Sequence, residues 1–288
     1  MTHAREESRV GRVRALVRRH PTTTFFLVTF LITWAVWVPN VLAPDSFVGT
    51  LAAYWTYMPA LAAVIVAAIV GSLRDLGARL VRWRVGWHWY AVVLIGPAAF
   101  YAAVAALQVG VGWSGGPDQP NAVRAALIGL LPLFLLFVLT DGLGEEPGWR
   151  GFALPRMLER TGPMLASLVL GVMWALYHLP LFWTVGRPLY GESFLILLIE
   201  LPAMSVLYTW VFQHTAGSAL LAILFHASGS TWWSLFVATV SAAEADRLRS
   251  ILVIVLLKWL LAAIVAMSWL RRTDRPSDEM QRATDASR

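Results

Sequence analysis

The sequence has no cysteine and few charged residues. The absence of cysteine excludes disulfide bonds, a thiolate nucleophile and zinc or iron–sulfur sites with cysteine ligands. Charged residues make up only 14% of the chain, against about a quarter in a typical soluble protein. Because 58% of the residues are hydrophobic, we expect most of the chain to lie in lipid.

Large polar blocks are also missing, so the sequence offers no separate soluble domain. Long apolar runs recur from Phe25 to Leu270, and the first of them lacks the small-residue cleavage site of a signal peptide. Neither end carries a lipidation motif. We predict a basic cytoplasmic arm over residues 1–23, one transmembrane domain over residues 24–270 and a polar cytoplasmic tail over residues 271–288.

The apolar runs predict an all-α bundle of about eight transmembrane helices. A helix needs roughly 20 apolar residues to cross the hydrocarbon core. The runs are continuously apolar, whereas the strands of a membrane barrel would alternate polar and apolar residues. The predicted spans lie near residues 24–43, 49–72, 89–110, 124–143, 164–184, 193–212, 217–239 and 250–270.

The distribution of arginine predicts the orientation of the bundle. The net charge of +6 lies largely in short clusters beside the apolar runs, which is typical of cytoplasmic membrane flanks and not of a nucleic-acid surface. The clusters are the N-terminal arm, the connection with Arg74, Arg79, Arg82 and Arg84, the connection with Arg150, Arg156 and Arg160, and the pair Arg271 and Arg272. We therefore expect a multi-pass protein of the plasma membrane with both termini in the cytoplasm, in contact with lipid and not with nucleic acid.

Ionisable residues inside apolar segments need a partner or a wet cavity, since their burial in lipid costs several kcal/mol. The segment from Asp141 to Arg150, DGLGEEPGWR, contains the adjacent carboxylates Glu145 and Glu146. Arg150 follows Glu146 by one helical turn, which favours a charge pair. Pro147 cannot donate a backbone hydrogen bond, so we expect the helix to kink or break there. An ordinary cytoplasmic salt bridge is an equally good interpretation of this segment alone.

Two histidines lie in other apolar segments. His178 precedes Pro180, and His226 is followed four residues later by Ser230, which places both on one helix face. Each histidine alone is typical of a packing residue. Convergence of the carboxylates, the arginine and the histidines in one pocket would relieve the cost of burying them all.

Other motifs weigh against rival chemistries. The sequence has no H-E-x-x-H of a zinc protease, no Gly-x-Gly-Asp pair and no Gly-x-Ser-Gly of a membrane serine protease. Glu200 and Lys258 also lie in apolar runs, where they could be mutual partners, transport residues or snorkelling groups. We give neither a catalytic role.

The order and spacing of the polar residues resemble the CPBP family, the CAAX-protease and bacteriocin-processing group of membrane proteins that includes the type II CAAX prenyl endopeptidase. The motifs are E-E-x-x-x-R at Glu145, Glu146 and Arg150, F-x-x-x-H at His178, and H-x-x-x-N or D at His226. The chain departs from them twice, because Trp174 replaces the motif phenylalanine and Ser230 replaces the asparagine or aspartate.

The resemblance implies an intramembrane glutamic endopeptidase. Glu145 with His178 would activate a water molecule, and His226, together with Ser230, would stabilise the oxyanion. Glu146 and Arg150 would support them. The candidate site residues are therefore Glu145, Glu146, Arg150, His178, His226 and Ser230.

The resemblance favours a mechanism without a cofactor, but the residue types leave an alternative open. Two histidines, a carboxylate and water also suit catalytic zinc, so Glu145, His178 and His226 would be the ligands of a divalent metal. The expected substrate is a membrane-associated peptide or protein, either of the CAAX type or related to bacteriocins. Two other functions use the same residues: a catalytically weak relative acting in bacteriocin immunity, which Ser230 favours, and a membrane scaffold or transporter.

Overall fold

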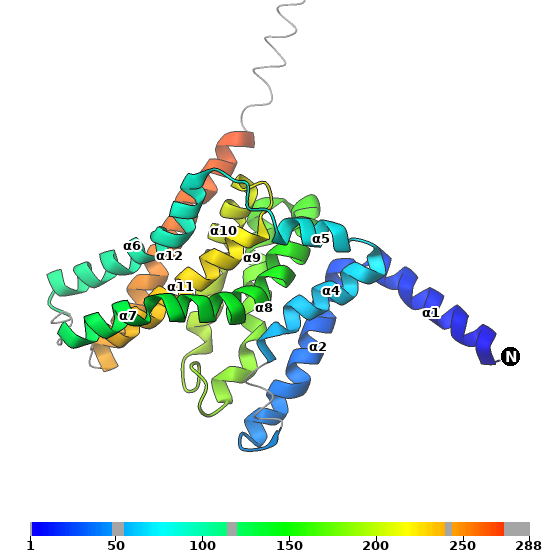
Figure 1. The fold of residues 1–288 in the computed structure, drawn as a ribbon, viewed down its shortest axis with the longest axis horizontal. Helices are drawn as coiled ribbons and strands as arrows, with labels where there is room; N and C mark the ends of the chain where they lie inside the picture. The colour runs from blue at the N-terminus through cyan, green and yellow to red at the C-terminus, as the bar shows by residue number, and fades with distance from the viewer. Residues whose placement is uncertain (1, 48–54, 114–119, 240–243, 274–288) are drawn as a thin grey trace, which may run out of the picture.

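The computed structural model describes residues 2–47, 55–113, 120–239 and 244–273. Within these residues the chain forms helices and no strands, so the predicted all-α fold is confirmed. Figure 1 shows the helices gathered into one bundle, with α1 extending away from it. Met1 and residues 274–288 of the predicted tail lie outside the described residues.

The helices occupy the following positions. In chain order they are α1 (Thr2–Arg19), α2 (Pro21–Leu42), η1 (Trp55–Tyr57), α4 (Met58–Val70), α5 (Leu73–Leu80), α6 (Trp87–Gly110), α7 (Pro120–Phe137), η2 (Val138–Gly142), α8 (Leu143–Glu146), η3 (Pro147–Ala153), α9 (Leu154–Tyr177), η4 (Leu179–Trp183), α10 (Phe194–His214), α11 (Ala219–Thr239) and α12 (Glu244–Thr273). The segments η2 and η3 are π-helical, whereas η1 and η4 are short 3₁₀ helices.

The length and apolarity of the helices make this a multi-pass membrane protein. Six stretches of the described chain are long and apolar enough to cross a bilayer. The predicted spans 124–143 and 164–184 fall in one continuous stretch, Ile128–Trp183, and the predicted span 49–72 contains only the 13-residue helix α4, with residues 49–54 outside the described chain. The number of spans and the cytoplasmic position of the termini stay predictions.

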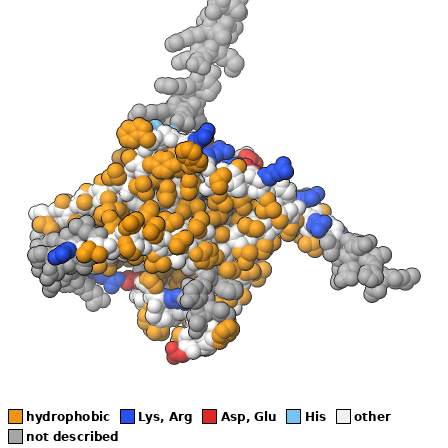
Figure 2. All heavy atoms as spheres, in the orientation of Figure 1, with side chains coloured by type: hydrophobic (Ala, Val, Ile, Leu, Met, Phe, Trp, Pro, Cys, Tyr) orange, Lys and Arg blue, Asp and Glu red, His pale blue; other side chains and the backbone are white. Residues whose placement is uncertain are grey.

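The surface of the bundle has the character of a lipid-facing surface. Large apolar side chains such as Leu131, Leu195 and Ile264 are exposed. Figure 2 shows hydrophobic side chains over the middle of the visible face and charged side chains along its margins. Such a surface would be unfavourable in water and is favourable in the hydrocarbon core.

The expected helix break at Pro147 is wrong. The backbone of Pro147 is helical, with φ −57° and ψ −34°, and the chain continues from α7 through η2, α8 and η3 into α9. A π turn bonds each N–H to the carbonyl five residues back, and single π turns inside α-helices are frequent at functional sites. The missing N–H of Pro147 at the start of η3 is therefore accommodated by a wider helix.

The chain reverses at Gly162, six residues beyond Arg156. Gly162 has a left-handed φ of 72° and is followed by Pro163, which starts the second part of α9. The prediction of a cytoplasmic connection that includes Arg150 is consequently wrong for that residue, because Arg150 is completely buried, while Arg160 is exposed near the reversal.

Close backbone contacts hold the segment with the two carboxylates in place. A Cβ atom on Gly144 would lie 2.8 Å from the carbonyl oxygen of Thr56, and one on Gly148 would lie 2.6 Å from that of Pro59. Small residues four apart allow helices in membranes to approach closely. These two glycines therefore fix the segment against η1 and α4.

A buried ion pair joins three helices of the other half of the bundle. Lys258 of α12 pairs with Glu200 of α10, and its Nζ lies 3.4 Å from the hydroxyl oxygen of Tyr101 on α6. Of the three interpretations of these residues, mutual partners is the one that their geometry fits. The pair satisfies two charges that would otherwise be costly at membrane depth.

Candidate active site

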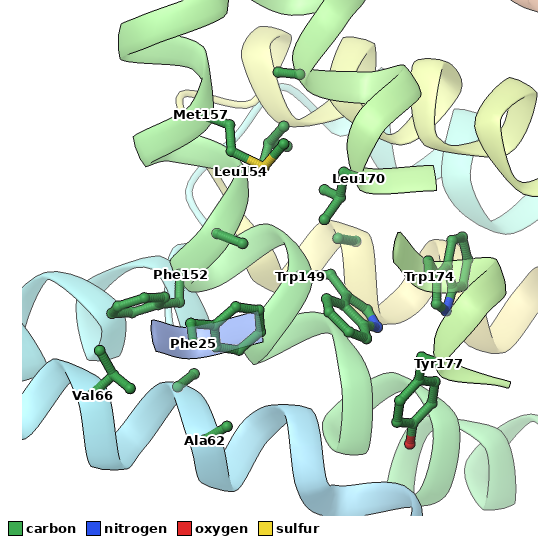
Figure 3. Close-up of a cluster of buried hydrophobic side chains, with 14 of the residues drawn as sticks. Phe25, Ala62, Val66, Trp149, Phe152, Leu154, Met157, Leu170, Trp174 and Tyr177 are labelled. Atoms are coloured by element: carbon green, nitrogen blue, oxygen red, sulfur yellow. The ribbon is translucent and has the colours of Figure 1, made fainter. Parts of the chain in front are cut away.

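Glu145 is a buried carboxylate held by two tryptophans. Its Oε2 atom accepts hydrogen bonds from Nε1 of Trp149 at 3.0 Å and from Nε1 of Trp174 at 2.5 Å. Its side chain is only about one-twentieth exposed. Figure 3 shows both indoles in the same cluster of buried side chains, together with Tyr177 and Phe25. The other oxygen of Glu145, Oε1, is left to face His178.

His178 lies at the end of α9 with its ring fixed by its own helix. Nδ1 lies 2.9 Å from the backbone carbonyl oxygen of Trp174, which can only accept, so Nδ1 carries a hydrogen. Nε2 lies 3.6 Å from Oε1 of Glu145, too far for a direct hydrogen bond. In the neutral ring Nε2 and Oε1 are both acceptors, so a proton donor is needed between or beside them.

Glu146 forms a second centre with Arg150 and His226. Its carboxylate accepts hydrogen bonds from one guanidinium nitrogen of Arg150, at 2.8 and 3.1 Å, and from Nδ1 of His226 at 2.8 Å. Glu146 and Arg150 are completely buried, and the side chain of His226 is about one-tenth exposed. The hydrogen bond to Glu146 engages Nδ1 and fixes the ring of His226. The other ring nitrogen, Nε2, is then the atom with which His226 can contact a substrate.

Two aromatic rings, roughly perpendicular to each other, contact Arg150. Its guanidinium carbon lies 4.4 Å from the ring centroid of Trp174 and 4.0 Å from that of Tyr208. Aromatic faces close to a cation stabilise it without water, which suits a completely buried arginine. Trp174 also contacts the ring of His226, with centroids 5.4 Å apart, so one indole borders both centres.

Ser230 lies one turn beyond His226 on α11, and its Oγ is 3.4 Å from Oδ2 of Asp141 in η2. Both side chains are half-buried. The structure therefore brings all six predicted site residues into one region, from the segment Leu143–Ala153 and from helices α9 and α11. Their chemical roles stay predictions.

Sequence reasoning missed three residues that touch the site: Asp141, Trp149 and Trp174. Trp149 follows Glu145 by four residues, and Trp174 precedes His178 by four, so helical periodicity could have placed both beside the site. The replacement of the motif phenylalanine by Trp174 looked like an exchange of one aromatic ring for another. In the structure it adds a hydrogen-bond donor that phenylalanine lacks.

Whether a metal ion could bind at this site depends on Nε2 of His178, Nε2 of His226 and the carboxylate of Glu145. Among the described residues, no group of three or more His, Asp or Glu side chains is arranged to hold a metal ion. A zinc ion would have to be held by Nε2 of His178, Nε2 of His226 and Oε1 of Glu145, because the other polar atoms of these side chains are engaged.

Comparison with known proteins shows that the chain is similar to a class of membrane peptidases. The family model described as "Type II CAAX prenyl endopeptidase Rce1-like" matches residues 127–232, which include every residue of the site. The match confirms the resemblance to CPBP and Rce1-type proteins that the motifs indicate, and it supports endopeptidase activity in the membrane.

One curated relative extends the similarity beyond the site. The chain is 24% identical over 220 residues to "CAAX prenyl protease 2" of Methanococcus maripaludis, and the match covers 70% of this chain and 80% of the relative. The similarity therefore includes much of the bundle around the site.

Proposed function

We propose that the protein is an intramembrane endopeptidase in which Glu145 and His178 activate a water molecule for hydrolysis of a membrane-associated peptide. The observation that carries this proposal is the pair of acceptors, Oε1 of Glu145 and Nε2 of His178, which lie 3.6 Å apart and come from separate helical segments. Two acceptors facing each other are unfavourable unless a donor lies beside them. A water molecule that donates one hydrogen to each satisfies both and keeps a lone pair free to attack.

In the proposed reaction, the water oxygen bonds to the carbonyl carbon of the peptide and one water proton passes to the Glu145–His178 pair. The C–N bond then breaks, and the same proton is delivered to the leaving amine. No oxidant or further reactant is needed. The two neutral indole donors keep Glu145 oriented toward the water.

His226 would stabilise the negative charge that develops on the peptide oxygen. Because Nδ1 donates to Glu146, donation from Nε2 to an oxyanion requires a doubly protonated ring. Glu146 supplies the counter-charge and is itself paired with Arg150 inside the bundle. A pre-organised donor of this kind contributes roughly 3 to 4 kcal/mol in the transition state.

The variant Glu145→Gln tests this proposal with little disturbance of the fold. The amide oxygen of glutamine can accept both indole hydrogens, and its NH₂ group can donate to Nε2 of His178, so the packing is kept while the base is lost. We expect normal insertion and a thermal midpoint close to that of the unmodified protein, with loss of cleavage. Glu192→Gln, which removes one partner of an ion pair with Arg247 remote from the site, is the matched control.

Two readouts serve the comparison. The first is a quenched-fluorescent peptide ending in a prenylated CAAX sequence, the substrate class in the name of the relative, assayed in detergent micelles. The second is quantitative proteomics of membrane fractions, in search of fragments produced by the unmodified protein and absent with Glu145→Gln. Equal fragment patterns for the two proteins, together with no peptide cleavage, would reject the proposal in favour of a scaffold or transport role.

We prefer the cofactor-free version because Oε2 of Glu145 accepts two indole hydrogen bonds, which leaves Oε1 to face Nε2 of His178. Dialysis against a chelator distinguishes it from the zinc alternative. We expect activity to survive dialysis. Loss of activity that only added zinc restores would transfer Glu145, His178 and His226 to a metal-binding role.

A further inference from the structure

The residue Asp141 has no role in the mechanism above, although its carboxylate reaches the site. It lies in the π turn η2, directly before the segment with Glu145, and its Oδ2 atom is 3.4 Å from Oγ of Ser230. It is also close enough to Glu145, His178 and His226 to interact with them electrostatically. A carboxylate in this position can therefore influence the residues that bind the proposed water and the oxyanion.

The contact limits what Ser230 can do. A serine hydroxyl has one hydrogen, and a neighbouring ionised carboxylate can only accept it. When Ser230 donates to Asp141, its lone pairs and not its proton face the rest of the site. Oxyanion stabilisation then rests on His226, and Ser230 contributes an oxygen whose direction Asp141 sets.

This geometry explains how the chain can differ from the motif at position 230. Asparagine and aspartate, the motif residues, share one property, an acceptor oxygen two bonds beyond Cβ. Serine has a shorter side chain with only a hydroxyl. In this chain a carboxylate oxygen from η2, Oδ2 of Asp141, lies 3.4 Å from that hydroxyl.

We propose that Asp141 is a positioning residue of the active site, which orients Ser230 and supplies from η2 the acceptor oxygen that the motif places on α11. The inference rests on the proposed function and adds to it a residue that none of the sequence motifs contains. It predicts that the carboxylate can be moved from one helix to the other without loss of activity.

The test is a relocation of the carboxylate, measured with the quenched-fluorescent CAAX peptide. Asp141→Ala should lower kcat about 10- to 100-fold with little change in KM, as expected for the loss of a positioning contact. Asp141→Asn, which keeps an acceptor oxygen, should lower it less. Ser230→Asp in the unmodified background places two carboxylates together and should also lower kcat, whereas Asp141→Ala combined with Ser230→Asp should recover most of the activity. A merely structural role of Asp141 would not produce this recovery.

Two results would overturn the inference: unchanged kcat in Asp141→Ala, or a double variant no more active than Asp141→Ala although it folds. Folding is checked by thermal unfolding in detergent, and the same data give a double-mutant cycle for Asp141→Ala and Ser230→Ala. Additive shifts of the midpoint would reject the contact itself. A third outcome separates the two proposals. If the midpoint shifts are non-additive, but the unmodified protein cleaves no peptide and its membrane fragments are the same as those of Glu145→Gln, the proposed function is rejected and the contact stands.

Discussion

Replacing Trp174 with phenylalanine tests whether indole donors hold the proposed base. The substitution restores the motif residue and keeps an aromatic ring beside Arg150 and His226, but it removes the N–H group that lies 2.5 Å from Oε2 of Glu145. Trp149 would remain as the other donor, at 3.0 Å. The carboxylate would keep one anchor of two and gain rotational freedom about its terminal bond.

The expected size of the effect follows from the type of bond. A hydrogen bond to a charged group contributes about 1.5 to 3 kcal/mol. If that energy holds Glu145 in its reactive orientation, kcat should fall about 10- to 100-fold, since 1.4 kcal/mol corresponds to a factor of ten. KM should change little because the indole is buried behind the carboxylate.

The assay is cleavage of the quenched-fluorescent peptide by purified Trp174→Phe, Trp149→Phe and the double variant, each with its thermal midpoint. Trp183→Phe, at an exposed indole, is the control for loss of an indole as such. We expect each single variant to be impaired and the double variant to be inactive. Full activity of Trp174→Phe at an unchanged midpoint would refute the reasoning, because the donor would then be dispensable for orienting Glu145.

Three further predictions concern packing, charge and the oxyanion. Gly148→Ala should lower the thermal midpoint and activity together, since its Cβ would lie 2.6 Å from a backbone oxygen, whereas Gly129→Ala, with nothing within 4 Å, should be tolerated in the same unfolding assay. Lys258→Met should lower the thermal midpoint because it leaves the half-buried Glu200 without its cation, and adding Glu200→Gln should recover much of that loss in a double-mutant cycle. His226→Gln should reduce kcat about 100- to 1,000-fold while the protein still unfolds cooperatively, and a loss below tenfold in the peptide assay would remove its oxyanion role.

The apolar runs predicted the all-α fold because burial in lipid imposes continuous apolarity on a span. The continuation of the helical chain through Pro147 could not be predicted from local propensities. Glycine and proline usually end helices in soluble proteins, but here Gly144 and Gly148 make close contacts with neighbouring backbone, and Pro147 starts a π turn. The decisive contacts come from η1 and α4, distant segments that local sequence does not reveal.

The meeting of the polar residues was predictable for a similar reason. An unpaired carboxylate or histidine at membrane depth is costly, so the positions of these residues in apolar segments predicted that they would lie together. Which atom pairs with which was not predictable, because it depends on helix rotation. The hydrogen bonds of Trp149 and Trp174 are the clearest case, since a tryptophan at either position is equally consistent with simple packing.

Glu145 and Glu146 are adjacent in the chain yet have different partners. Neighbouring residues of a helix project in different directions, so Glu145 turns toward His178 on α9 and Glu146 toward His226 on α11. Each carboxylate is held by the residue four positions further on, but Trp149 is a neutral donor and Arg150 a cation. A carboxylate neutralised by arginine is a poor base, whereas one fixed by neutral donors keeps its charge and can take a proton from water. The segment Glu145–Arg150 thus contains two interleaved pairs, and the neutral one favours Glu145 as the base of the proposed reaction.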